Sequence, residues 1–417
     1  MLSRSFLSDI LRRVSSMPWS VDSDSSIADA CRTLIEERSE AAGLVLARDI
    51  LDRFEAASAA DQAAFFEQVA DRFGADETSL SQAISDWRAG DADATRRLHY
   101  AAEPRSLALL RTLNRVPGAT ARLVRMREKL LGNLQQAPGL SGLDNDFQHV
   151  FSSWFNRGFL ELRRIDWSTP AAVLEKIIEY EAVHEIAGWD DLRQRVADPD
   201  RRLFGFFHPA MGDEPLIFVE IALMKRIPAS IGAIIAAERE SLDPVDAKVA
   251  VFYSISNCHA GLKGISFGNF LIKQVVANLN DELPGLTTYV TLSPVPGLRR
   301  YVDSAERNHE LLGDIAGTDG SPPGKEAARK LAARYLTGAK RSNGWAHDPV
   351  ANFHLSNGAE LYDIHADADP SPVGLQNAWG VMVNYRYDPA RTEANHRAYV
   401  REGEVIVSSK VRSLVRK

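Results

Sequence analysis

The sequence has only two cysteines, Cys31 and Cys258, among its 417 residues. Two thiols cannot form a disulfide framework, so a disulfide-stapled module is excluded and a reducing compartment is expected. No run of about 18 apolar residues occurs, so no transmembrane helix is expected. Acidic residues (56) outnumber basic ones (49), and the net charge of −7 argues against a broad nucleic-acid-binding surface. A local basic pocket for one anionic ligand is still allowed.

The two ends of the chain lack clear targeting signals. Residues 1–20 place three arginines among spaced apolar residues, as transit peptides do, but Asp9 interrupts the pattern. A short docking helix is the alternative for this segment. The final Ser-Leu-Val-Arg-Lys is not a peroxisomal signal. We therefore expect a cytoplasmic protein.

The first half of the chain has the apolar periodicity of helices. A helix is expected over residues 106–131, which Pro117-Gly118 can break. Another begins where Thr169 can cap the first turn and Pro170 can occupy the first helical position. These patterns predict an all-helical domain over residues 1–190, serving packing or oligomerisation. The apolar residues that recur at helical spacing are Leu46, Ile50, Leu51 and Phe54, then Phe66, Val69 and Phe73, then Leu80, Ile84 and Trp87.

The pattern changes near residue 200 to short apolar runs typical of buried strands. Such runs occupy residues 216–223, 249–256 and 286–292, and a helix over 269–280 separates the last two. This order predicts a βαβ unit with a right-handed crossover. The chain is therefore predicted to be α+β, with a catalytic domain over residues 191–417.

The C-terminal third alternates between loops, helices and strands. The Gly/Pro-rich residues 317–324 predict a surface loop, and residues 325–335 predict a helix. Residues 350–355 and 359–364 flank Asn357-Gly358, which predicts a tight hairpin. Residues 381–387 predict a last strand.

A glycine-rich turn, Lys263-Gly-Ile-Ser-Phe-Gly268, lies between a predicted strand and helix. Small residues expose backbone N–H groups there, and the helix starting near Asn269 adds its positive end, so the turn suits a pyrophosphate. The turn fits neither the Walker loop nor the dinucleotide fingerprint. It is closer to the loop by which GNAT-type acetyltransferases hold coenzyme A, with Lys263 as the basic residue and Ser266 in place of a glycine. A packing turn without a ligand is the alternative reading.

Two further residues are candidates for chemistry. Ser293, in Leu-Ser-Pro-Val-Pro-Gly, ends the next strand, on the side of a sheet where ligands bind. No Gly-x-Ser-x-Gly elbow surrounds it, so an acyl-enzyme is not indicated. His354 has a pKa range suited to proton delivery. A capping serine and a structural histidine are the alternatives.

Metal catalysis finds little support. Histidines and aspartates gather between His347 and Asp369, but neither His-Glu-x-x-His nor paired cysteines occur. We therefore expect no metal ligands.

These stretches, in this order, resemble malonyl-CoA decarboxylase. The resemblance covers about two thirds of the chain, from residue 142 onward, and its motifs are Ser152-Ser-Trp-Phe, Glu179-Tyr-Glu-Ala-Val-His, Gly212-Asp-Glu-Pro-Leu, Phe252-Tyr-Ser-Ile-Ser, Gly261-Leu-Lys-Gly, Leu292-Ser-Pro-Val-Pro-Gly, Asn352-Phe-His-Leu and Asn384-Tyr-Arg-Tyr. It implies a helical domain followed by a GNAT-like catalytic domain. It also implies a homo-oligomer, with a tetramer suggested by the family, acting in fatty acid metabolism.

The resemblance assigns roles to particular residues. Ser293, His354 and Tyr387 match the catalytic serine, the catalytic histidine and a functionally important tyrosine. Lys263, Gly264, Ser266, Gly268 and Asn269 would bind the coenzyme A portion of the substrate. Some relatives have a glutamate where this chain has Ser266, so any role of that acid does not transfer.

The implied reaction converts malonyl-CoA to acetyl-CoA and carbon dioxide through an enolate. His354 would be the proton donor or the charged partner of the enolate, Ser293 would donate a hydrogen bond to the malonyl group, and Tyr387 would position the thioester or its carboxylate. The thioester is itself the electron sink, so no cofactor is expected. An acetyltransferase and a catalytically silent acyl-CoA sensor are the alternatives. No acceptor-amine site supports the first, and a sensor needs neither Ser293 nor His354.

Overall fold

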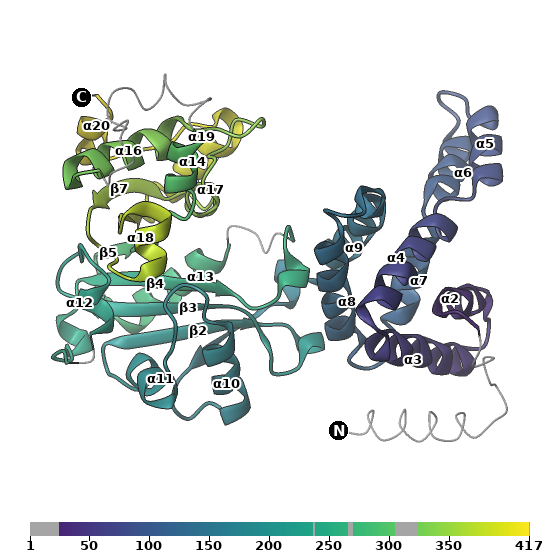
Figure 1. Cartoon of the computed structure of the whole chain (residues 1–417), viewed down its shortest axis with the longest axis horizontal. Helices are drawn as coiled ribbons and strands as arrows, with labels where there is room; N and C mark the ends of the chain where they lie inside the picture. Colours follow the sequence, from purple (N-terminus) through teal and green to yellow (C-terminus); the bar gives the residue numbers. More distant parts are fainter. Residues whose placement is uncertain (1–24, 237, 266–269, 305–322, 417) are drawn as a thin grey trace. The chain divides into compact units, whose positions relative to one another are not determined.

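The computed structural model describes residues 25–236, 238–265, 270–304 and 323–416. The possible transit segment and most of the predicted loop at 317–324 lie outside these residues. The chain divides into two compact units (Figure 1). The first comprises Met1–Leu160, His208–Gly212 and His259–Ser266, and the second comprises Glu161–Phe207, Asp213–Cys258 and Phe267–Lys417. The predicted domain boundary at residue 190 falls inside the second unit.

The described part of the first unit is helical, as predicted. Several of its helices begin at side-chain caps, among them Ser39, Ser58 and Asp76, whose oxygens accept free N–H groups of the first turn. The chain breaks between two helices at Pro117-Gly118, where Gly118 adopts a φ of 79°. The helices are α2 (Ile27–Glu36), α3 (Glu40–Ala56), α4 (Ala59–Arg72), α5 (Glu77–Asp86), α6 (Ala92–Ala102), α7 (Arg105–Leu113), α8 (Ala119–Asn133) and α9 (Ser141–Trp154), with short 3-10 turns at Pro138–Leu140, Arg157–Phe159, Pro209–Met211 and Ala260–Leu262.

Aromatic rings form the core of this unit. Phe54, Phe65 and Phe66 lie 5.2–5.8 Å apart between ring centroids, and all three are buried. Apolar residues of the hairpin formed by α5 and α6 instead face solvent. Ile84 is 59% exposed and Tyr100 is 66% exposed.

The second unit is built on a mixed sheet. The strands are β1 (Glu161–Ile165), β2 (Arg201–Phe207), β3 (Pro215–Met224), β4 (Val249–Asn257), β5 (Thr288–Thr291), β6 (Ser293–Pro294), β7 (Glu360–His365) and β8 (Met382–Tyr387). The helices are α10 (Ala171–Tyr180), α11 (Trp189–Val196), α12 (Gly232–Ile235), α13 (Phe270–Glu282), α14 (Leu298–Asp303), α16 (Lys325–Gly338), α17 (Pro349–Ser356), α18 (Pro372–Ala378), α19 (Thr392–Glu402) and α20 (Ser409–Val415), with a 3-10 turn at Pro244–Asp246.

The strand order is β1-β2-β3-β4-β5-β8-β6, and β7 pairs with the other side of β8. β4 and β5 are parallel and flank α13 in sequence, which confirms the βαβ order. The other described pairs are antiparallel. The predicted α+β class, a helical region followed by a mixed-sheet domain, is therefore confirmed. Within the described ranges, no helix has the length and apolarity needed to cross a bilayer.

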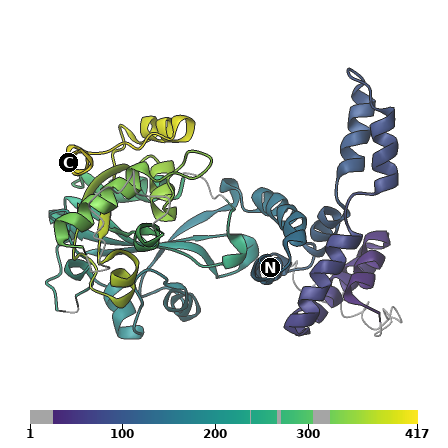
Figure 2. The same ribbon diagram turned by 45° about the horizontal axis from the view of Figure 1, so that its top comes forward.

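Helices cover the sheet on both sides. α10 and α11 pack on one side of β2 and β3 through a buried cluster that includes Val173, Leu192, Leu203 and Phe218. C-terminal helices lie on the other side of the strands, as Figure 2 shows in green and yellow. The predicted cap of α10 is wrong, because the Thr169 hydroxyl accepts the N–H of Asp166 at 3.0 Å instead of a helix N–H.

β4 opens away from its parallel neighbour at its carboxyl end. The ladder with β5 stops at the pair Phe252 and Thr291, whereas β4 continues to Asn257. A bulge leaves Tyr253 without a partner on β3 at the same point. Residues after Thr291 therefore leave the β4 ladder and pair with β8 instead.

Candidate active site

Ser293 is placed by a short strand pairing beyond the end of β5. It forms the first residue of β6 and lies opposite Val383 of β8. Pro294 follows and has no N–H to continue a ladder, so the strand ends there. The serine side chain is buried, with 6% of the residue exposed.

His354 comes from a helix, so the predicted hairpin at Asn357-Gly358 is wrong. The Asp348 side chain accepts the N–H groups of Val350 and Ala351, and Pro349 occupies the first turn, so residues 350–355 start a helix and not a strand. Gly358, with a φ of 83°, ends α17, and a side chain there would lie 2.0 Å from the carbonyl oxygen of Thr392. The Asn-Gly pair is a helix terminus.

The three predicted catalytic residues meet in one buried chain of hydrogen bonds. Ser293 Oγ lies 3.0 Å from His354 Nε2, and His354 Nδ1 lies 2.9 Å from the Tyr387 hydroxyl. Ser293 donates its own proton to Thr291 Oγ1 at 2.9 Å. Because the only hydroxyl proton of Ser293 points to Thr291, Ser293 Oγ accepts a hydrogen bond from His354 Nε2–H. The neutral imidazole then has no proton on Nδ1, which accepts a hydrogen bond from the Tyr387 hydroxyl. One proton arrangement satisfies every group in the chain.

Burial sets the charge of this chain. It lowers the pKa of His354 to about 3, because a charged imidazolium would lose its hydration inside the protein. Burial also raises the pKa of Tyr387 well above its usual range. The resting site therefore holds a neutral imidazole and a protonated phenol at neutral pH.

Three neighbouring residues to which the sequence interpretation gave no role hold this arrangement in place. The ring of Tyr385 stacks on His354 with centroids 4.6 Å apart and an interplanar angle of 25°. Thr291 accepts from Ser293 and also from the Tyr385 N–H at 3.2 Å. Asn384 then donates to the Thr291 carbonyl oxygen at 2.8 Å. The alternation of side chains along a strand could have found Tyr385, which lies two residues before Tyr387 and therefore on the same face of β8.

A cavity of about 470 Å³ has Tyr387 among its lining residues. It lies between α13 and α19, and Tyr289 contributes to its wall beside Tyr387. Its lining is largely apolar, while Lys273 and Glu393 form an ion pair of 3.1 Å among its lining residues. The other lining residues are Ile272, Val276, Ala277, Asn280, Pro389 and Thr392.

The glycine-rich turn is described only in its first part. Lys263 is exposed, and Gly264 adopts a φ of 83°, which favours glycine. Both belong to the first unit, whereas Ser293, His354 and Tyr387 belong to the second. Ser266, Gly268 and Asn269 lie outside the described residues, so the predictions for them stay predictions.

The acidic and histidine residues between His347 and Asp369 do not gather into one site. Lys410 pairs with Asp363 at 2.6 Å, and Lys325 pairs with Asp367 at 2.6 Å. His365 bonds to Asn384 at 2.6 Å. The described residues contain no group of three His, Cys, Asp or Glu side chains that could hold a metal ion.

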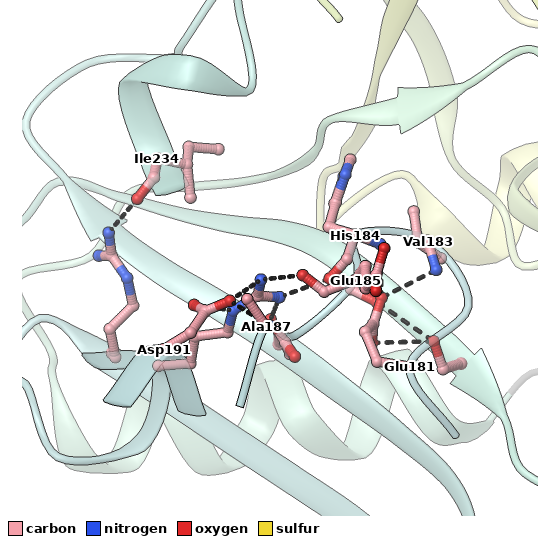
Figure 3. A network of polar contacts seen from close by, with 12 residues as sticks. Glu181, Val183, His184, Glu185, Ala187, Asp191 and Ile234 are labelled. Carbon is pink, nitrogen blue, oxygen red and sulfur yellow. Dashed lines mark hydrogen bonds and ion pairs between the residues drawn. The ribbon is translucent and has the colours of Figure 1, made fainter. Parts of the chain in front are cut away.

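A second buried network pins the segment before α11 to β4 (Figure 3). Glu181 accepts hydrogen bonds from the N–H groups of Val183 and His184 at 2.9 and 2.7 Å. It also accepts from the hydroxyls of Ser254 and Ser256 at 2.8 and 3.0 Å. The carboxylate therefore ties two parts of the chain 73 residues apart.

Arg195 completes this network from α11. It donates to the carbonyl oxygens of His184 and Glu185 and forms ion pairs with Asp191 and the buried Glu220. Burial raises the pKa of Glu220 to about 7, although Arg195 acts in the opposite direction. These contacts give the Glu179–His184 motif a structural role, because they hold the segment before α11 against β4.

Family models and curated relatives named as malonyl-CoA decarboxylases match this chain. The model of the family described as malonyl-CoA decarboxylase C-terminal domain matches residues 158–317 and 324–417, and the N-terminal domain model of malonyl-CoA decarboxylase matches residues 73–155. The mitochondrial malonyl-CoA decarboxylases of Anser anser anser and Mus musculus are each 35% identical over 77% of this chain, which spans 71% and 73% of their lengths.

Solved structures agree with these matches. The malonyl-CoA decarboxylase of Rhodopseudomonas palustris superposes with a TM-score of 0.86 at 48% identity, covering 93% of this chain and 98% of that one. The malonyl-CoA decarboxylase of Agrobacterium vitis gives a TM-score of 0.85 at 45% identity, covering 94% and 100%.

Proposed function

The chain belongs to the malonyl-CoA decarboxylase family, and on that premise we propose that it converts malonyl-CoA to acetyl-CoA and carbon dioxide at the buried chain of Ser293, His354 and Tyr387. Such an enzyme is a carboxy-lyase. The observation that carries the proposal is the continuous hydrogen bonding from Tyr387 through His354 to Ser293.

The reaction makes two demands on the protein. The bond between the carboxylate carbon and the methylene carbon breaks, and its electron pair moves onto the thioester carbonyl as an enolate. The methylene carbon then takes up a proton to give acetyl-CoA. The site must therefore hold a hydrogen-bond donor for the enolate oxygen and a route for one proton.

Ser293 and His354 meet the first demand. In the resting site, Ser293 directs its proton toward Thr291, and a small rotation about its Cβ–Oγ bond redirects that proton to a thioester oxygen. His354 Nε2–H is the second donor at the same point. Both groups are neutral and buried, so they stabilise developing negative charge without screening by water.

Tyr387 and His354 meet the second demand as a relay. As Nε2–H passes its proton to the enolate carbon, Nδ1 takes the phenolic proton of Tyr387, so the imidazole stays neutral. After acetyl-CoA leaves, a proton from solvent reaches the vacated Nε2 and the Nδ1 proton returns to the phenolate, which restores the resting tautomer of His354. The low pKa of His354 favours this relay over a resident imidazolium as the partner of the enolate.

The coenzyme A end of the substrate is assigned to the glycine-rich turn, with Lys263 and Gly264 as its described residues. The apolar walls near Tyr289 suit the thioester arm. Lys273, already paired with Glu393, is a weaker candidate for a phosphate.

We further propose a cytoplasmic homo-oligomer that needs no metal or other cofactor and acts in fatty acid metabolism. The buried, unpaired Cys31 and Cys258 suit a reducing compartment. The exposed apolar residues of the α5–α6 hairpin, Ile84, Trp87 and Tyr100, suit contact with another copy of the chain, for which a tetramer is expected. Light scattering of the purified protein tests the oligomer.

The decisive experiment is turnover by the purified chain. Malonyl-CoA is supplied without an amine acceptor, and acetyl-CoA and carbon dioxide are measured together. Equal amounts of both products support the proposal. Acetyl transfer that depends on an added amine indicates the acetyltransferase alternative, and tight binding without products indicates a sensor.

A further inference from the structure

Arg127 of α8 is a charged residue with no role so far, although only 1% of it is exposed. Its Nε donates to Asp144 of α9 at 2.7 Å. Its Nη1 donates to two carbonyl oxygens, that of Gly261 in the 3-10 turn Ala260–Leu262 at 2.7 Å and that of Lys263, the first residue of the glycine-rich turn, at 2.8 Å. Gln148 donates to the other oxygen of Asp144 at 2.7 Å. All of these residues belong to the first unit.

The turn that Arg127 contacts has a defined conformation. Lys263 has φ −55° and ψ 130°, Gly264 has φ 83°, and the N–H of Ile265 donates to the carbonyl oxygen of Leu262 at 3.0 Å. These values fit a type II turn whose central peptide joins Lys263 to Gly264.

Arg127 fixes the direction of that central peptide. In a planar trans peptide, C=O and N–H point in opposite directions. Because the Lys263 carbonyl points at Arg127, the Gly264 N–H points away from α8. That N–H has no hydrogen-bond partner among the described residues. The guanidinium also polarises the peptide, which makes the N–H a stronger donor.

The close fit of the turn against α8 leaves little freedom for another arrangement. A side chain at Gly261 would lie 1.9 Å from the carbonyl oxygen of Val124. The backbone therefore rests directly on the helix, and Arg127 makes its contacts at the same place.

We propose that Arg127 is a positioning residue that aims the Gly264 N–H at the pyrophosphate of coenzyme A. This inference rests on the proposed function. It adds that the helical unit shapes the turn that binds the nucleotide end of the substrate. Arg127 itself does not touch the substrate. Asp144 holds the guanidinium in place and balances its charge.

The test compares two substrates that share the reacting group. Malonyl-CoA carries the pyrophosphate, and malonyl-pantetheine lacks it. Arg127→Met should lower kcat/KM for malonyl-CoA about 10- to 100-fold, the range for losing a hydrogen bond to a charged group, mainly through a higher KM. For malonyl-pantetheine the same variant should match the unmodified enzyme.

Controls separate positioning from a general loss of structure. Arg122→Met removes an arginine from the same helix that pairs with Glu55 and Asp52 and does not contact the turn, so it should leave both substrates unchanged. Arg127→Lys keeps the positive charge but lacks the planar set of N–H donors of the guanidinium. It takes the place of Arg127→Met in the same comparison of substrates if Arg127→Met does not fold.

Each outcome decides between the possibilities. An equal loss with both substrates, or no loss with either, overturns the role of Arg127. If the unmodified enzyme releases carbon dioxide from neither thioester, the proposed decarboxylase function itself is wrong. That outcome is distinct from a failure of the positioning role of Arg127.

Discussion

The neutral, buried His354 makes the stability of the protein depend on pH in a predictable way. Its pKa is about 3 in the folded protein, against an ordinary value of 6.5 in the unfolded chain. Between pH 6.5 and pH 3, the imidazole of His354 is protonated in the unfolded chain but not in the folded protein. The stability associated with the neutral imidazole is therefore complete above pH 6.5 and is lost as the pH falls toward 3.

The magnitude follows from this difference in pKa. Each unit of pH inside the window removes about 1.4 kcal/mol from the free energy of unfolding. Between pH 7.5 and pH 4.5, the contribution of His354 falls by about 2.5 kcal/mol, since the loss is only partial near pH 6.5.

The assay is urea unfolding at both pH values for the unmodified chain and for His354→Gln, which cannot be protonated. Other titrating groups contribute equally to both proteins and cancel in the difference. The unmodified chain should lose about 2.5 kcal/mol more than the variant on acidification.

His99→Gln serves as the matched control, because it removes an exposed imidazole from α6. Its loss on acidification should equal that of the unmodified chain. If His354→Gln also loses the same amount, His354 is not held neutral and the proton relay has no basis.

Four further predictions concern activity. Folded Ser293→Ala and His354→Asn should each lower kcat by ~10²–10³-fold, the range for lost oxyanion donors and acid–base groups, and near-normal turnover by either excludes that residue from the mechanism. Tyr387→Phe keeps the ring but removes the partner of Nδ1, so kcat should fall about tenfold in steady-state assays while KM changes little. Gly264→Val should raise KM for malonyl-CoA because valine disfavours a φ of 83°, and unchanged affinity in a folded variant contradicts the binding site. Dialysis against EDTA should leave turnover unchanged, whereas loss followed by recovery with zinc would reveal a metal site.

Local sequence patterns predicted the regular elements of the fold well. The apolar runs that became β3 and β4 are continuous, because both faces of these strands are covered. The helix break at Pro117-Gly118 was likewise visible, because proline and glycine act on the backbone directly.

The errors arose where one signal has two structural meanings. Asn357-Gly358 fits a hairpin turn and a helix terminus equally. Asp348 with Pro349, nine residues earlier, decides for the helix. β1 and β2 carry charged residues, which hid them from a search for apolar runs. Arg202 of β2, for example, pairs with Glu282 at 2.7 Å.

The structure brings together Ser293, His354 and Tyr387, which the sequence singled out, but their geometry was not predictable. Ser293 and His354 lie 61 residues apart, and no sequence periodicity predicts the 3.0 Å contact between Ser293 Oγ and His354 Nε2. Arg127 illustrates the same limit, because its partners on the glycine-rich turn lie more than 130 residues away. An arginine on a helix looks like a solvated charge until the fold buries it.

The division of the chain into two units has a consequence for anyone who wishes to separate them. The backbone passes from one unit to the other five times, at residues 160/161, 207/208, 212/213, 258/259 and 266/267. No single cut therefore yields either unit whole. A fragment starting at Glu161 would still carry residues 259–265 but would lack Arg127, which contacts them, and Asp144, which holds Arg127. Such a fragment would retain Ser293, His354 and Tyr387 and yet present its glycine-rich turn without a support, so family boundaries drawn along the sequence are poor guides for dissecting this enzyme.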